Sequence, residues 1–124
     1  MSIVNNNKTK GTLNSSSTNY VQIGNVLNGP INIIVSLVES SSVGYQLYRN
    51  YNINIYPNYA DSWVNTYNYY HYIGNSSIST IAFSNGTGYS YDSIFNIQVN
   101  YGIVYLKSVN ASYTPLKYYI TYQF

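Results

Sequence analysis

Residues 45 to 55, YQLYRNYNINI, decide the fold class of this chain. Apolar or aromatic residues stand at positions 45, 47, 51, 53 and 55, and they alternate with Gln46, Asn50, Asn52 and Asn54. Arg49 is the one charged residue on the apolar side. A repeat of two residues places alternate side chains on opposite faces of a β-strand. The segment therefore predicts a strand with one buried face and one face exposed to water.

The same alternation recurs along the chain. It is clear at residues 31–38, 95–101 and 118–124, and weaker at residues 20–27, 67–73, 78–83 and 103–109. Strong helix formers are scarce, whereas β-branched and aromatic residues dominate. About eight strands without a helical crossover predict an all-β fold, an antiparallel two-sheet sandwich of jelly-roll or immunoglobulin-like topology.

Two further features refine this prediction. Asn85-Gly86 and Asn100-Tyr101-Gly102 are typical of turns between strands, and Asn85-Gly86 is a good hairpin candidate because both residues tolerate positive φ. Ile34 and Val38 interrupt the polar side of their strand, which indicates that this face is partly covered as well.

The first 19 residues differ from the rest. Residues 5–19, NNNKTKGTLNSSSTN, contain one Leu and otherwise polar, small or flexible residues. Such a segment buries little apolar surface. We therefore expect residues 1–19 to form a flexible N-terminal arm, or one ordered only by a neighbour, and residues 20–124 to form a single β-sandwich domain.

The composition excludes several classes of protein. The 124 residues include 18 Tyr and no Cys, with five Lys or Arg against three Asp or Glu. The absence of Cys excludes disulfide scaffolds and Cys-based zinc modules. The basic residues are too few to track a phosphate backbone, so nucleic acid is not an expected partner. No apolar run approaches the roughly 20 residues of a membrane-spanning helix, and no secretory signal follows Met1.

Catalytic groups are also scarce. His71 is the only His, and although a triad can be drawn with Asp61 or Asp92 and a Ser, no GxSxG sequence accompanies it. A place in an aromatic cluster is the favoured interpretation of His71, which has Tyr on both sides. Three carboxylates are few for a glycosidase pair or a calcium loop. We expect no enzyme activity, no catalytic residue, no bound metal and no cofactor.

Residues 56–72 concentrate aromatic side chains with amides and one acid. Within this segment Tyr59, Asp61, Trp63 and Tyr67 form the candidate recognition surface. Three interpretations stay open: packing in the core with the hydroxyls at the surface, contact between subunits, or stacking on a sugar whose hydroxyls bind the amides.

Five N-x-S/T sequons are candidate glycosylation sites. They lie at Asn7, Asn14, Asn75, Asn85 and Asn110. Their number is close to what chance gives in a chain this rich in Asn, Ser and Thr. The sites are therefore available for modification, but their number is no evidence of selection for glycosylation.

The low charge has a physical consequence. Acid denaturation comes mainly from the protonation of carboxylates that are paired in the native state, and this chain has only three carboxylates to protonate. Low charge also removes the repulsion that keeps soluble proteins apart. The chain thus suits permanent assembly or an extracytoplasmic, acidic setting.

Two stretches carry a resemblance to known proteins. YRNYNINIYPNYADSWVNTYNYYHY and YDSIFNIQVNYGIVYLKSVNASYTPLKYYITYQF are rich in Tyr, Asn, Ser, Thr and Ile and poor in Lys, Glu and Asp. In composition and strand rhythm the chain from about residue 20 onward resembles virion and surface proteins of hyperthermophilic, acid-living archaea and their viruses. This resemblance implies a β-sandwich capsid, turret or fibre component, or an extracellular filament subunit. A start at Met1 without a signal favours the virion.

We therefore expect a non-enzymatic structural protein of the virion or extracellular surface. Its partners would be other copies of itself or other virion or surface proteins, contacted through Tyr/Asn-rich faces and strand edges. The N-terminal arm and the strand over residues 118–124 would be suited to exchange with neighbours. The alternative is a carbohydrate-binding module, or the receptor-binding part of a viral fibre, with glycans as partners.

Overall fold

The computed structural model describes residues 8–17, 19–26, 29–40, 46–57, 61–65, 68–73, 78–87 and 90–123. These residues form ten β-strands and one short 3-10 helix, which confirms the all-β prediction. The strands are β1 (Lys8–Leu13), β2 (Val21–Asn25), β3 (Ile31–Ser40), β4 (Gln46–Pro57), β5 (Asp61–Asn65), β6 (Asn68–Ile73), β7 (Ile78–Thr87), β8 (Ser90–Asn100), β9 (Ile103–Ser108) and β10 (Leu116–Tyr122). The helix η1 spans Ala111–Tyr113.

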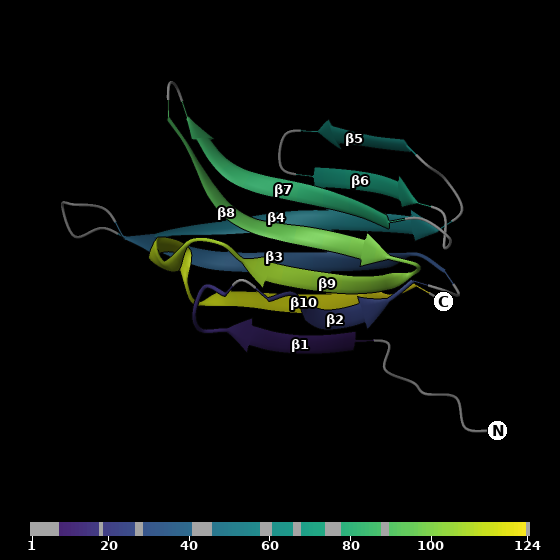
Figure 1. Cartoon of the computed structure of the whole chain (residues 1–124). Coiled ribbons are helices and arrows are strands. Elements are labelled where there is room, and N and C mark those ends of the chain that lie inside the picture. The colour runs from purple at the N-terminus through teal and green to yellow at the C-terminus, as the bar shows by residue number, and fades with distance from the viewer. Residues whose placement is uncertain are drawn as a thin grey trace.

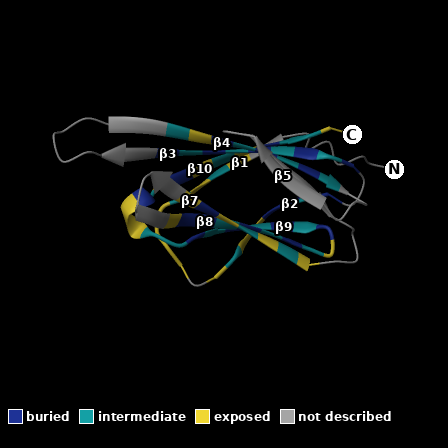
Figure 2. Cartoon of the chain, turned by 90° about the horizontal axis from the view of Figure 1, so that it is seen from above, coloured by how far each residue is buried: buried dark blue, intermediate teal, exposed yellow. Residues whose placement is uncertain are grey.

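The strands form two sheets that pack face to face, as Figures 1 and 2 show. Sheet A has six strands in the order β1-β10-β3-β4-β6-β5, and sheet B has four in the order β2-β9-β8-β7. The predicted two-sheet sandwich is thus confirmed, with ten described strands in place of about eight. The order departs from the ABED and CFG sheets of an immunoglobulin constant domain.

One strand pair is parallel. β4 and β6 run in the same direction, whereas each other pair of neighbouring described strands is antiparallel. After β4 the chain forms β5 at the outer edge of sheet A and returns as β6 between β4 and β5. Two reversals of direction therefore bring β6 alongside β4 with the same orientation.

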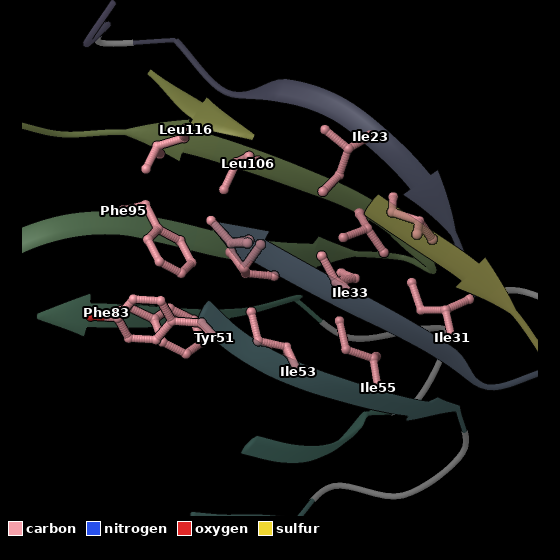
Figure 3. Packing of buried hydrophobic residues seen from close by; sticks show 14 of the residues in the cluster. Ile23, Ile31, Ile33, Tyr51, Ile53, Ile55, Phe83, Phe95, Leu106 and Leu116 are labelled. Carbon is pink, nitrogen blue, oxygen red and sulfur yellow. The ribbon is translucent and has the colours of Figure 1, made fainter. Parts of the chain in front are cut away.

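The apolar sides of the predicted strands form the core between the sheets. In β3 the residues Ile31, Ile33, Val35 and Leu37 are buried, and in β4 they are joined by Tyr51, Ile53 and Ile55. Figure 3 shows five of these side chains facing those of sheet B, namely Ile31, Ile33, Tyr51, Ile53 and Ile55. The period of two thus positions the buried face of each strand, as expected.

A cluster of three aromatic rings joins the sheets at one end of this core (Figure 3). Phe83 and Phe95 stack with ring centroids 4.5 Å apart, and Tyr51 meets both rings edge to face, at 5.8 and 5.2 Å. A bulge at Ile94 lies next to this cluster: the register shifts there, and Ile94 and Phe95 are both buried. The bulged residue stays bonded, since its carbonyl accepts the N–H of Val109 at 3.1 Å.

The N-terminal segment requires a correction. Residues 8–13, expected to belong to a flexible arm, form β1 and pair with β10 along the whole strand. The segment then crosses to sheet B, where the N–H of Ser17 donates to the carbonyl of Ser108 at 3.0 Å. The polar composition hides this strand because its order comes from pairing with residues more than 100 positions away. Residues 1–7 lie outside the described residues.

The turn predictions have two outcomes. Asn85-Gly86 lies inside β7 and pairs with Asp92 and Tyr91, so the hairpin closes later, at the pair Thr87–Ser90. β7 and β8 thus stay paired beyond the position of the predicted turn. Tyr101-Gly102 does connect β8 to β9, with φ of 50° and 82°, the positive pair of a type I′ turn.

The placement of β10 corrects a further expectation. Residues 118–122 lie between β1 and β3 and are paired on both sides, so they present no open edge. Among the described strands, the open edge on this side of sheet A belongs to β1. Within the described ranges, no helix has the length and hydropathy needed to cross a membrane.

Candidate recognition surface

The predicted recognition residues are only partly placed. Tyr59 and Tyr67 lie outside the described residues. Asp61 and Trp63 lie in β5, the edge strand of sheet A, and their backbones pair with Tyr72 and Tyr70 of β6.

The register continues this arrangement into the centre of sheet A. Tyr70 pairs with Asn54 of β4, and Tyr72 pairs with Tyr56. Trp63 therefore belongs to the same row of residues as Asn54, and Asp61 to the row of Tyr56. The structure brings these two predicted residues to one edge of an amide-rich sheet.

The outer face of sheet A carries a network of amides and hydroxyls. Asn32 lies opposite Asn54 on the neighbouring strand, and its Nδ2 donates to the Oδ1 of Asn54 at 3.0 Å and to the Oδ1 of Asn52. Two pairs further along this face, the hydroxyl of Ser36 donates to the Oδ1 of Asn50 at 2.7 Å. Asn50, Asn52 and Asn54, on the polar side of YQLYRNYNINI, thus face outward, as predicted, and their amides are held by cross-strand partners.

Next to this network the outer face is hollowed into an open trough of about 480 Å³. The trough lies over β1, β10 and β3, and it is lined by Lys10, Gly11, Thr12, Ile34, Ser36, Lys117, Tyr118 and Tyr119. Sequence reasoning missed this site, because its residues come from three segments that meet only in the folded sheet.

The strand register explains how the trough is built. Lys10 of β1 pairs with Tyr119 of β10, which in turn pairs with Ile34 of β3. Residues directly opposite one another on neighbouring strands share a face of the sheet. One row across the trough therefore contains an ammonium group, an aromatic ring and an apolar side chain.

The neighbouring row is polar. Thr12 pairs with Lys117, and Lys117 pairs with Ser36. Lys10 and Lys117 therefore lie on the diagonal between adjacent strands, and both are exposed. None of the described residues that line the trough is Asp or Glu. The trough is thus a positively charged site with a hydroxyl group on either side of Lys117.

Ile34 forms the apolar part of the trough. It is half-buried, which agrees with the predicted partial cover of this face, and Tyr119 beside it is 38% exposed. Ile34 was therefore the one signal in the sequence that marked this region. The side chain of Val38, the other interrupting residue, lies outside the described side chains.

The outer face of sheet B carries a second Lys beside a Tyr. The Nζ of Lys107 lies 5.3 Å from the ring centroid of Tyr20, within the range of a cation–π interaction. The amide of Asn96 donates to the hydroxyl of the same Tyr20 at 3.4 Å. The ring and the hydroxyl of Tyr20 thus have partners within the protein. This distinguishes the Lys107–Tyr20 pair from the Lys10–Tyr119 pair of the trough.

The candidate sequons lie in different surroundings. Asn14 is exposed in the segment after β1, Asn85 lies in β7, and Asn7 and Asn75 are outside the described residues. Asn110 caps η1, where its Oδ1 accepts the N–H of Ser112, the serine of its own sequon, at 3.0 Å.

His71 lies in β6, with its backbone paired to Ile55 and Ser62. Among the described residues no three His, Cys, Asp or Glu side chains gather in a group that could hold a metal ion.

No protein-family model, curated protein or solved structure matches the chain. The function is therefore inferred from the residues and geometry of this chain.

Proposed function

We propose that this protein is a non-enzymatic structural protein of a virion or extracellular surface, which assembles with other copies of itself through strand edges and the outer face of sheet A. The observation that carries the proposal is the position of β1. This strand, the first that the structure describes, lies at the edge of sheet A and pairs with β10 alone among the described strands.

An edge strand that pairs with a single neighbour is suited to exchange between subunits. The six residue pairs between β1 and β10 can form within one chain or between two chains with the same register. Residues 14–17 that follow β1 are exposed, and a backbone hydrogen bond from Ser17 to Ser108 joins their end to sheet B. Exchange would therefore replace each pairing contact with an identical one.

The outer face of sheet A supports assembly under acidic conditions. Its described hydrogen bonds join amides and hydroxyls, which keep their donors and acceptors when pH falls. Interfaces built on such groups do not depend on carboxylate ionisation. This supports a virion or surface location exposed to acid.

A cysteine pair tests the exchange of β1. The chain has no Cys, so Thr12→Cys with Lys117→Cys introduces a single pair at directly opposite positions of β1 and β10. The spacing of opposite residues in a sheet permits a disulfide. After assembly and oxidation, we expect covalent dimers or longer ladders on a non-reducing gel.

The control is Thr12→Cys with Lys107→Cys, which places the two thiols on opposite sheets. It should give no intramolecular disulfide. Size-exclusion chromatography with light scattering at pH 3 and pH 7 completes the test. A strictly monomeric protein at both pH values, with a disulfide formed only within the chain, would refute the proposal, and mass spectrometry of purified particles checks the location.

Carbohydrate recognition is the second candidate function. The trough favours it, because an exposed Tyr119 stands beside the hydroxyls of Thr12 and Ser36. The support thus comes from residues other than the predicted Tyr59, Asp61, Trp63 and Tyr67.

A further inference from the structure

We infer that the trough over β1, β10 and β3 binds an acidic oligosaccharide, with a sugar carboxylate between Lys10 and Lys117 and a sugar ring stacked on Tyr119. This inference rests on the carbohydrate-binding alternative and does not depend on self-assembly.

The first argument is charge. Lys10 and Lys117 occupy diagonal positions on adjacent strands, and none of the lining residues that the structure describes is acidic. An anion between two ammonium groups accepts charge-assisted hydrogen bonds from both, which are stronger than bonds between neutral groups. The two lysines are exposed, so an incoming carboxylate can reach them without a change in the fold.

The second argument is the apolar part of the lining. Tyr119 and Ile34 are neighbours across the strands, and Tyr119 keeps 38% of its surface exposed. The C–H groups on one face of a pyranose ring form an apolar surface that packs on an aromatic ring. An isolated inorganic anion would leave this apolar surface uncovered, whereas a sugar acid covers it.

The third argument is size and polarity. The volume of about 480 Å³ falls in the range of roughly 300–1,000 Å³ typical of small-ligand sites. Thr12 and Ser36 offer hydroxyls that both donate and accept hydrogen bonds, which suits sugar hydroxyls. Two lysines are too few for a nucleic acid backbone, whose affinity requires several phosphate contacts.

The test is a titration of the full chain with trigalacturonate, in which binding is monitored by two-dimensional NMR. The methyl ester of the same trisaccharide is the matched ligand control, because it keeps the rings and hydroxyls and removes the charge. We expect trigalacturonate to bind at least about tenfold more tightly than the ester, with an affinity that falls as salt increases. Chemical shift changes should centre on β1, β10 and β3.

Protein variants separate the two parts of the site. Lys10→Gln and Lys117→Gln should each weaken trigalacturonate binding about fivefold or more and leave ester binding unchanged. Tyr119→Ser should weaken the binding of both ligands. Lys107→Gln is the matched control, since it removes a lysine beside a tyrosine on the outer face of sheet B, and it should bind trigalacturonate as the parent protein does.

Several outcomes would overturn the inference. They are equal binding of the acid and the ester, a loss in Lys107→Gln as large as in Lys117→Gln, or no binding of trigalacturonate at millimolar concentration. Triglutamate binding as tightly as trigalacturonate, and insensitive to Tyr119→Ser, would assign the trough to acidic peptides. If binding fails while the cysteine pair still reports exchanged β1 strands, this inference falls and the structural function stands.

Discussion

The hydroxyl of Tyr122 in β10 accepts a hydrogen bond from the backbone N–H of Asn25 in β2, at 3.2 Å. The two residues belong to different sheets and lie 97 positions apart in the chain. Gly24 permits this approach, because a Cβ at Gly24 would stand 3.1 Å from the same hydroxyl oxygen. The last strand of the chain is therefore tied to the opposite sheet by a polar contact beside the apolar core.

Tyr122→Phe should destabilise the protein because it removes this contact and keeps the ring. We expect a loss of about 0.5–1.5 kcal/mol in the free energy of unfolding, measured by urea denaturation. Tyr119→Phe, on the outer face of the same strand, is the control and should change stability by less than about 0.5 kcal/mol. Equal effects of the two variants would contradict the role given to the Tyr122 hydroxyl.

Gly11→Ala should weaken the attachment of β1. Gly11 lies opposite Tyr118, and a Cβ there would overlap the hydroxyl and Cζ of that side chain and lie 2.8 Å from its Cε1. The ring has to turn away from the core, and we expect a loss of about 1–3 kcal/mol in thermal or urea unfolding. In a Tyr118→Ala background the same substitution should cost much less. An unchanged cost in that background would rule out the steric explanation.

Tyr101→Asn should stabilise the protein. Tyr101 has a φ of 50° and is 57% exposed, so it is strained in the β8–β9 turn while its ring contributes little packing. Asn is favoured at the first position of a type I′ turn, and we expect a gain of about 0.5–1 kcal/mol in the free energy of unfolding. Tyr101→Ala removes the ring without easing the backbone and should bring no gain. A gain shared by both variants would show that the ring, and not φ, is unfavourable.

Ser108→Ala should also stabilise the protein or leave its stability unchanged. Ser108 is 1% exposed, and its hydroxyl has no hydrogen-bond partner among the described residues. A buried hydroxyl without a partner keeps its desolvation cost, so its removal should raise the free energy of unfolding by up to about 1 kcal/mol. Ser93→Ala, at an exposed position of β8, serves as the reference. A clear loss of stability in Ser108→Ala alone would mean that the hydroxyl is bonded in solution.

Local alternation was sufficient to predict the central strands. The segments that became β3, β4 and β8 carry apolar residues at alternate positions, with Arg49 as the exception, and those whose side chains the structure describes form the core. The pattern is local because neighbouring residues in a strand point to opposite faces. The prediction of outward amides in β4 followed from the same fact.

Pairing between distant segments could not be predicted from the sequence. β1 contains a single Leu, and its order comes from β10 at the other end of the chain. The parallel position of β6 likewise depends on where the chain returns after β5. Neither pairing leaves a periodic pattern in the sequence, because each depends on which other strand has an open edge.

The sequence by itself determined an all-β chain with few charges, with one apolar side on each main strand and with amides and tyrosines in place of charged groups. The tertiary structure alone decided which of these groups meet. Lys10 and Tyr119 are 109 positions apart, yet the register of β1 on β10 sets them side by side over Ile34. Composition and alternation are local properties, whereas a binding surface on a sheet is set by register, which only the folded chain defines.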